Sequence, residues 1–237
     1  MESLRLKDRI ALITGASRGI GAAVARRFAA EGARLILLAR TTGALEQIDD
    51  EIQSISGFPA TLVPLDLQEF DGIDRLGALL HERFGHLDIL VGNAGILGSL
   101  SPIGHTDLKT WDQVMAVNLT ANLRLIRSMD PLLQNSEAGR AIFVTSAVGT
   151  QPRAFWSAYA VSKAALEMMV QIYAKENIKT AVCANLVNPG RTRTRMRAQA
   201  MPGEDPLSLK SPDEITDTFV EFAEPSNQNN GITLDCQ

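Results

Sequence analysis

The sequence has few of the residues that form the disulfides and metal sites of small or secreted proteins. Its 237 residues include only two cysteines, Cys183 and Cys236, and three histidines. Two cysteines cannot form a disulfide framework or a cysteine-based zinc site, which favours a reducing compartment. The histidines, His81, His86 and His105, are too scattered in sequence to indicate a metal site, and we expect no bound metal.

Long apolar runs and an excess of positive charge are also lacking. The longest apolar runs, such as 35–39 and 89–91, are far shorter than the roughly 20 residues that cross a bilayer. The opening segment carries several charges and has no apolar core of a signal peptide. A formal net charge of −4 argues against binding to nucleic acid. These absences predict a cytoplasmic protein without a membrane or nucleic-acid partner.

What the sequence does contain is typical of a globular protein. Hydrophobic residues make up 45% of the chain and charged residues 21%. The length predicts a single domain over residues 1–237. Apolar stretches of strand length recur along the chain, at residues 9–15, 34–40, 60–67, 87–95, 140–147, 179–190 and 231–236. Several of them are apolar throughout, as expected when both faces of a parallel sheet are covered.

Stretches with helical periodicity separate these strands. They span residues 20–30, 42–56, 70–84, 108–133, 158–176 and 212–222. Repeated strand–helix–strand units predict an α/β fold: a Rossmann-type, doubly wound parallel sheet of about seven strands with helices on both faces. Segment 191–210 interrupts this alternation and is too long for an ordinary connection, so we expect it to be a substrate lid.

A glycine-rich turn follows the first predicted strand and opens the first predicted helix. It has the spacing G-x-x-x-G-x-G and comprises Gly15, Ser17, Arg18, Gly19, Ile20 and Gly21. Glycines allow a sharp turn and close approach to a pyrophosphate, and the helix N-terminus offers free N–H groups to the anion. The alternative is a tight strand–helix turn with no ligand. The position of the turn on the first strand favours a dinucleotide site.

The end of the second strand indicates which dinucleotide. An acidic residue there would accept hydrogen bonds from the adenosine ribose, whereas an arginine accommodates a 2′-phosphate. The chain has Arg40 at this point, and Arg18 in the glycine-rich turn. Two guanidinium groups near one phosphate favour NADP(H) over NAD(H). The alternative is that Arg40 is only a solvated residue at the strand end.

Three residues form a candidate reaction centre. Ser146 lies at the end of the fifth predicted strand, and Tyr159 and Lys163 lie four residues apart on the next helix, so both project from one face. The carboxyl ends of parallel strands and the starts of the following helices border the ligand crevice of such sheets. A Tyr-x-x-x-Lys pair alone is usually a helix surface pair. Its order after a glycine-rich turn and a serine-ended strand makes it a candidate for catalysis.

Taken together, these motifs resemble the classical short-chain dehydrogenase/reductase family over essentially the whole chain. Within it, the sequence looks most like a little-characterised bacterial oxidoreductase subgroup. The shared features are the segment TGASRGIG (14–21), Asp66, Asn93-Ala94-Gly95, Asn118, Ser146, Tyr159-x-x-x-Lys163, and Pro189-Gly190 followed by Thr194. One departure is Gly92, where the family often has a second asparagine, and we expect it to loosen a contact in the sheet.

The resemblance implies a role for each of these residues. Tyr159 would be the general acid or base, and Lys163 would bind the nicotinamide ribose and lower the pKa of that tyrosine. Ser146 would hydrogen-bond the substrate oxygen, and Asn118 would hold a water linked to Lys163; the alternative for Asn118 is a structural asparagine that bonds its own backbone. The other residues implied in cofactor binding are Asp66 and Leu67 at the adenine, Asn93, Ala94 and Gly95 at the ribose, and Pro189, Gly190, Thr192 and Thr194 at the nicotinamide end.

The substrate side is less informative. Ile96, Leu97, Val148, Phe155, Trp156 and Met196 suggest an apolar slot, with Arg153 as a cationic edge. Lid arginines at 191, 193, 195 and 197 alternate with other residues. One of them, or Arg153, is a candidate for binding an anionic group of the substrate. The alternative is that they are solvated charges, some of them touching the cofactor phosphates.

The sequence therefore predicts an NADP-dependent oxidoreductase acting on a small carbonyl compound or secondary alcohol. The alternative is a non-catalytic NADP-responsive binding or regulatory protein, which would not need Ser146, Tyr159 and Lys163 together. An epimerase or dehydratase with the same Tyr-x-x-x-Lys pair normally has a longer chain. The resemblance also implies a homodimer or homotetramer, formed through the helices that carry Asn118 and Tyr159.

Overall fold

A parallel sheet lies at the centre of the protein. The computed structural model describes residues 4–237, and within that range seven strands form one sheet in the order β3-β2-β1-β4-β5-β6-β7. Every neighbouring pair of strands is parallel. The strands are β1 (Ile10–Thr14), β2 (Arg34–Ala39), β3 (Thr61–Pro64), β4 (Ile89–Gly92), β5 (Arg140–Val144), β6 (Cys183–Asn188) and β7 (Thr233–Asp235). The predicted doubly wound sheet is confirmed.

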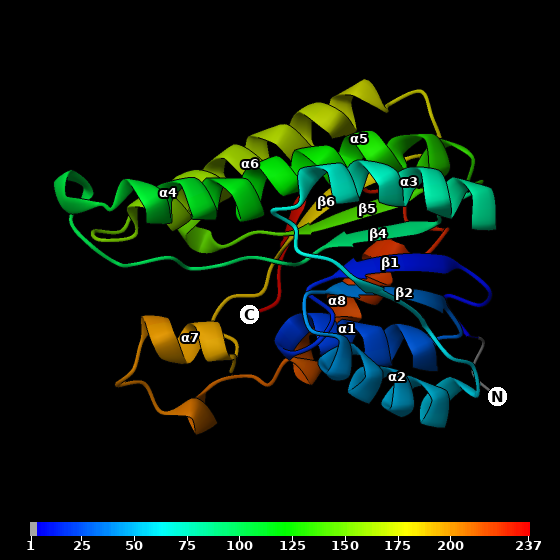
Figure 1. Cartoon of the computed structure of the whole chain (residues 1–237), viewed down its shortest axis with the longest axis horizontal. Helices are drawn as coiled ribbons and strands as arrows, with labels where there is room; N and C mark the ends of the chain where they lie inside the picture. The colour runs from blue at the N-terminus through cyan, green and yellow to red at the C-terminus, as the bar shows by residue number, and fades with distance from the viewer. Residues whose placement is uncertain (1–3) are drawn as a thin grey trace.

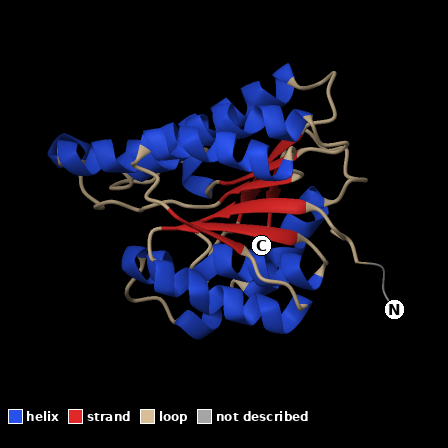
Figure 2. Ribbon diagram, turned by 45° about the vertical axis from the view of Figure 1, so that its right-hand side comes forward, coloured by secondary structure: helices blue, strands red, loops and turns tan. Residues whose placement is uncertain are grey.

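Helices cover both faces of the sheet (Figures 1 and 2). One face carries α1 (Gly19–Ala30), α2 (Thr42–Ser56) and α8 (Thr216–Ala223). The opposite face carries α3 (Phe70–Phe84), α4 (Leu108–Met115), α5 (Ala121–Gln134) and α6 (Ser157–Glu176). The short helix α7 (Arg195–Ala200) lies apart from both layers, beyond one end of the sheet (Figure 1).

Two hydrophobic cores sandwich the sheet because successive side chains of a strand point to opposite faces. Ile13 and Leu37 pack with α1, α2 and α8, whereas the adjacent Leu12 and Ile36 pack with α3, α5 and α6. All four are at most 1% exposed. The uninterrupted apolar runs in the sequence therefore have a simple cause, which is that each strand must supply a core on both sides.

The expected helix at 108–133 is not regular along its length. It consists of α4 and α5 joined by a π-helical turn at Ala116–Thr120, which contains Asn118. Single π-turns widen a helix locally and occur frequently at functional sites. The hydrophobic periodicity on either side does not reveal this turn, because one extra residue per turn changes the apolar stripe little.

The lid segment 191–210 contains helix α7, which the sequence analysis did not predict. This helix has six residues, and the Thr194 hydroxyl accepts a hydrogen bond from the backbone N–H of Arg197 at its start. The interposed arginines leave no apolar stripe from which periodicity could identify a helix.

Gly92, which departs from the family pattern, lies at a point with no room for a side chain. It pairs with Phe143 across β4 and β5. A Cβ atom at Gly92 would lie 2.3 Å from Cδ1 of Phe143 and 2.8 Å from Oδ1 of Asn122. The expected loosening of the sheet is therefore compensated here, because the phenyl ring fills the space that a larger residue at position 92 would take.

We expect Gly92→Ala to destabilise the protein by about 1–3 kcal/mol, because overpacking a close-packed core forces its neighbours to move. The free energy of unfolding in urea measures this change. Gly203→Ala is the control, since a Cβ at Gly203 meets nothing within 4 Å. In a Phe143→Val background the cost of Gly92→Ala should fall. An equal cost in both backgrounds would show that the ring is not the obstacle.

Candidate active site

A large cleft lies at the carboxyl ends of the strands, where open α/β sheets bind their ligands. Its volume is about 1240 Å³. Residues that follow six strands contribute to the wall, from Gly15 after β1 to Pro189 after β6. Most of the predicted site residues line it: Gly15, Ser17, Arg18, Gly19, Ile20, Arg40, Asp66, Leu67, Asn93, Ala94, Gly95, Ser146, Tyr159, Lys163, Pro189, Gly190, Thr192 and Thr194. The two that do not line it are Gly21 and Asn118.

The glycine-rich turn leaves the start of α1 open to the cleft. Gly15 and Gly19 have positive φ values of 65° and 57°, which glycine adopts without strain. A Cβ at Gly21 would lie 2.3 Å from the carbonyl oxygen of Gly15, so this glycine allows close packing rather than ligand contact. No side chain caps the N-terminus of α1, and its first turn has no acidic residue. The turn thus suits a pyrophosphate.

Asn93 supports the glycine-rich turn from the neighbouring strand. Its side-chain amide donates to the carbonyl oxygen of Thr14 at 2.9 Å and to that of Gly15 at 3.3 Å. The Thr14 hydroxyl in turn accepts hydrogen bonds from the backbone N–H groups of Asn93 and Ala94. These bonds join the end of β1 to the end of β4 and fix the wall on which the family would place the ribose.

Two exposed arginines stand at the end of the cleft expected to hold adenosine. Arg40 directly follows β2, and its guanidinium lies 3.8 Å from the carboxylate of Asp66. An ion pair this long and this exposed contributes little energy, so Arg40 can turn to an anionic ligand. Arg18, the N-cap residue of α1, is also exposed. Both positions fit the counter-charges for a phosphate.

Tyr159 and Ser146 meet deep in the cleft. Ser146 begins the short turn after β5, and Tyr159, which is 8% exposed, lies in the first turn of α6. Burial raises the pKa of Tyr159 to about 12, and the influence of the Ser146 side chain opposes this shift. A phenol in this environment is protonated at neutral pH and can donate a proton.

Lys163 is buried one helical turn further along α6. Its ammonium group donates to the carbonyl oxygen of Val144 at 2.7 Å and lies 5.7 Å from the centre of the Tyr159 ring. Burial lowers the pKa of Lys163 to about 8, and the charge of Glu167 opposes this shift. Burial is the largest influence on the pKa of Tyr159, and the lowering by Lys163 that the resemblance implies stays a prediction.

Asn118 lies behind the reaction centre rather than in the cleft wall. Its side-chain amide donates to the carbonyl oxygen of Ile96 and to the Ser162 hydroxyl, and its carbonyl oxygen accepts from the backbone N–H of Ile96. Its own backbone carbonyl accepts from the side chain of Asn122. The residue therefore ties the π-helical turn to α6 and to the loop after β4.

An apolar cluster surrounds Tyr159 on the substrate side. Trp156 meets the Tyr159 ring edge to face, with ring centres 6.0 Å apart, and Leu97 completes the buried part. The lid adds Met196 and Met201, and Val148 also packs there. Ile96, Leu97, Trp156 and Met196 line the cleft as expected from the sequence, whereas Arg153 and Phe155 are exposed outside its wall. Arg153 stacks on Trp156 at 5.3 Å.

The lid arginines divide into two groups. Arg197 forms two short contacts with Glu204, at 2.5 and 2.7 Å, and Arg191 lies 3.9 Å from the same carboxylate. Arg193 and Arg195 line the cleft, and within the described chain neither has an acidic partner within 4 Å. Arg193 and Arg195 are thus the lid arginines available to a ligand.

The sequence analysis missed Glu167, a buried carboxyl group next to the reaction centre. It is 8% exposed and accepts a hydrogen bond from the Thr145 hydroxyl at 2.5 Å. The signal was present, since Glu167 follows Lys163 by four residues and therefore shares its helix face. Burial was the missing information, because glutamate at such a position is usually solvated.

Other features bear on metal and membrane binding. No group of three or more His, Cys, Asp or Glu side chains in residues 4–237 is arranged to hold a metal ion. Among the helices of that same range, none has the length and apolar character needed to span a bilayer.

Comparison with known proteins agrees with this geometry. The family model for short chain dehydrogenase matches residues 9–205. The chain is 39% identical over 235 residues to the uncharacterized oxidoreductase YciK of Escherichia coli K12, covering 98% of this chain and 93% of YciK. The crystal structure of a protein from Escherichia coli CFT073 complexed with NADPH is 39% identical, covers 100% of both chains and has a TM-score of 0.96.

A related structure from Shigella flexneri, complexed with NADP, is 38% identical with a TM-score of 0.96, again over 100% of both chains. The family model covers most of the sheet and the whole reaction centre. On these grounds the chain belongs to the short-chain dehydrogenase/reductase family of oxidoreductases.

Proposed function

We propose that this protein is an NADP-dependent oxidoreductase that interconverts a small carbonyl compound and a secondary alcohol. The observation that carries the proposal is the meeting of Ser146, Tyr159 and Lys163 in one cleft with the glycine-rich turn. The relatives complexed with NADPH and NADP support the choice of cofactor. The uncapped start of α1 and the two exposed arginines fit its phosphates.

The three residues divide the chemistry of carbonyl reduction. A bound reduced nicotinamide supplies the hydride to the carbonyl carbon. Ser146 donates a hydrogen bond to the carbonyl oxygen and stabilises its developing negative charge. Tyr159 transfers its hydroxyl proton to that oxygen, which completes the alcohol. Lys163 holds the cofactor ribose and stabilises the phenolate left on Tyr159.

Direction and pKa are linked in this scheme. Without cofactor, the pKa of Tyr159 is about 12, so the phenol is protonated and ready to act as an acid. Alcohol oxidation needs the phenolate form of Tyr159. Lowering the pKa of Tyr159 by one unit takes roughly 1.4 kcal/mol of added stabilisation of the phenolate. A positively charged Lys163 and a cationic oxidised nicotinamide are the two sources of that stabilisation.

The alternative is a non-catalytic NADP-responsive binding or regulatory protein. Such a protein needs the glycine-rich turn and Arg40 but gains nothing from a buried tyrosine and a buried lysine beside a serine. Burying Lys163 to 3% exposure has a large desolvation cost. The presence of all three residues therefore supports catalysis.

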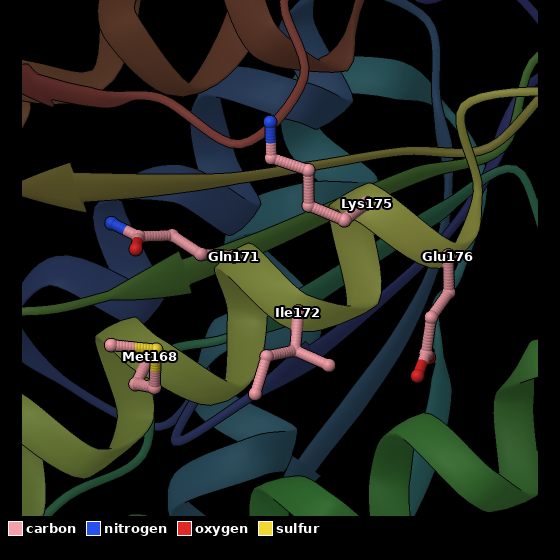
Figure 3. A pocket seen from close by; sticks show the side chains of 5 residues that line it. All are labelled: Met168, Gln171, Ile172, Lys175 and Glu176. Carbon is pink, nitrogen blue, oxygen red and sulfur yellow. The ribbon is translucent and has the colours of Figure 1, made fainter.

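We further propose that the protein is cytoplasmic and forms a homodimer or homotetramer through α5 and α6. Val161, Met168 and Ile172 share one side of α6 and are 41–59% exposed, and Leu123 on α5 is 44% exposed. A pocket on this side of α6 is lined by Met168, Gln171, Ile172, Lys175 and Glu176, whose side chains Figure 3 shows. An apolar stripe with both charges at its edge suits a second copy of itself.

Tyr159→Phe should lower the rate of carbonyl reduction by about 10²–10⁴-fold, because the proton donor is lost. The affinity for NADPH should be nearly unchanged, since the hydroxyl serves proton transfer. Steady-state kinetics and NADPH fluorescence titration measure the two effects. Tyr173→Phe is the matched control, because Tyr173 is the only other tyrosine and its hydroxyl bonds Asp130 away from the cleft. Retained turnover in Tyr159→Phe would refute the catalytic assignment.

Arg40→Asp should weaken NADPH binding by about 1.5–3 kcal/mol more than NADH binding, because a charge-assisted hydrogen bond to the 2′-phosphate is lost. Calorimetric titration of both cofactors gives the difference. Arg34→Asp makes the same change of charge at the opposite end of β2 and serves as control. Equal losses for NADPH and NADH in Arg40→Asp would contradict a 2′-phosphate contact.

Replacing Met168 and Ile172 together by lysine should dissociate the oligomer, because two charges would be buried in an apolar contact. Analytical ultracentrifugation gives the mass. Leu207→Lys adds a charge at a residue that is 81% exposed on the lid and should leave the mass unchanged. A monomeric unmodified protein, or an unchanged mass in the double variant, would exclude this surface.

A further inference from the structure

Glu167 is a buried acid whose presence the fold alone does not explain. It lies on α6 with 8% of its surface exposed, and its carboxyl group accepts a hydrogen bond from the Thr145 hydroxyl at 2.5 Å. In the described chain no arginine, lysine or histidine nitrogen lies within 4 Å of it. A buried carboxylate without a close cation is costly, so its presence needs a reason.

Lys163 supplies a reason. It precedes Glu167 by four residues on α6, so the two side chains share one helix face. Both are buried, at 3% and 8% exposure. Burial lowers the pKa of Lys163 to about 8, close to neutral pH, and the Coulomb attraction of Glu167 is what opposes that shift. Removing this charge would let Lys163 lose its proton at a lower pH.

The other groups around Lys163 do not supply a negative charge. Strand β5 presents the Val144 carbonyl oxygen, which accepts from the ammonium. A Cβ at Gly95, in the loop after β4, would lie 3.7 Å from the Lys163 nitrogen and 3.3 Å from the Asn118 side-chain oxygen. On α6 itself the other titratable neighbour is Tyr159, whose pKa of about 12 keeps it neutral. Glu167 is thus the acid that faces this lysine.

Glu167 is also part of the contact that fixes Ser146. The backbone N–H of Thr145 donates to Val187 on β6 at 2.9 Å, while its hydroxyl donates to Glu167. Ser146 is the next residue in the chain. The turn after it approaches so closely that a Cβ at Gly149 would lie 2.8 Å from the Glu167 carboxyl oxygen. One hydrogen bond therefore joins the serine segment to the helix of the tyrosine and lysine.

We propose that Glu167 is a positioning residue of the reaction centre. Its carboxylate, which accepts a hydrogen bond from Thr145, keeps the Lys163 ammonium charged and fixes the position of Ser146 relative to α6. The assignment rests on the proposed function, since it assumes that Lys163 binds the cofactor ribose. This role explains why an acid is buried here, which packing alone does not. It also predicts that Glu167 affects the pH dependence of cofactor binding.

The test is the affinity for NADP⁺ as a function of pH, measured by calorimetry, which needs no turnover. In the unmodified protein the affinity should begin to fall near pH 8, where Lys163 loses its proton. In Glu167→Gln this fall should start about one pH unit lower, which makes binding near neutral-to-alkaline pH up to roughly tenfold weaker. At about pH 6, where Lys163 is protonated in both proteins, the affinities should be similar.

Four further variants separate the effect of the charge from structural damage. Glu167→Asp keeps the charge and should restore most of the normal profile. Glu221→Gln removes an exposed carboxylate from α8 and is the control. If Glu167→Gln does not fold, Thr145→Val and Thr145→Ser take its place. The valine removes the hydrogen bond and should move the profile in the same direction, whereas the serine keeps the hydroxyl and should not.

The outcomes distinguish this inference from the function on which it rests. A Glu167→Gln or Thr145→Val profile that superimposes on that of the unmodified protein would overturn the role of Glu167 and leave the proposed function intact. A uniform loss of affinity at every pH would also overturn it, because that result indicates structural damage. An unmodified protein that binds neither NADP⁺ nor NADPH would overturn both.

Discussion

The main physical constraint on the reaction centre is the burial of one amino group, that of Lys163. Lys163 is 3% exposed, and taking an isolated cation out of water has an effective cost of several kcal/mol. Two interactions offset this cost: the Val144 carbonyl oxygen accepts a hydrogen bond from the ammonium, and the charge of Glu167, four residues further along α6, attracts it. Tyr159 shares the same interior, and its raised pKa has the same cause as the lowered pKa of Lys163.

Parallel strands bring these groups together from distant parts of the chain. Every strand ends at the same edge of the sheet, so the turn after β1, the loop after β4 and the turn after β5 meet without long connections. Asn93 and Asn118 then fix the relative positions through side-chain bonds to backbone atoms, to the end of β1 and to Ile96 respectively. Amides suit this task because each both donates and accepts. The pocket wall is thus held by polar contacts, whereas the sheet beneath is held by hydrophobic burial.

Order and periodicity predicted the sheet and the place of the cleft, whereas the resemblance to the family supplied most of the individual cleft residues. Short apolar runs bounded by turn residues are typical of buried strands, and a glycine-rich turn, a serine and a Tyr-x-x-x-Lys pair in that order indicate one edge of the sheet. Three features could not be predicted from the sequence, for physical reasons. The π-helical turn at Asn118 changes the spacing by one residue, helix α7 has no apolar stripe, and the burial of Glu167 depends on Thr145 and Gly149, which approach it only in the folded chain. The roles of the individual site residues stay predictions.

The two ends of the cleft have opposite character, and this division bears on specificity. At one end the guanidinium groups of Arg18 and Arg40 are exposed, where they could attract an anion through solvent. Around Tyr159 the wall is apolar, and the lid supplies part of it through Met196. In the described chain the ion pairs of lid residues 191–204 run to Glu204, which belongs to the lid itself. The lid is therefore braced internally and rests on the reaction centre mainly through apolar contact. If the proposed function holds, a substrate that fills this slot would compete with the lid methionines for the surface of Trp156. The shape of the lid would then select the substrate, and Tyr159 and Lys163 would determine the reaction.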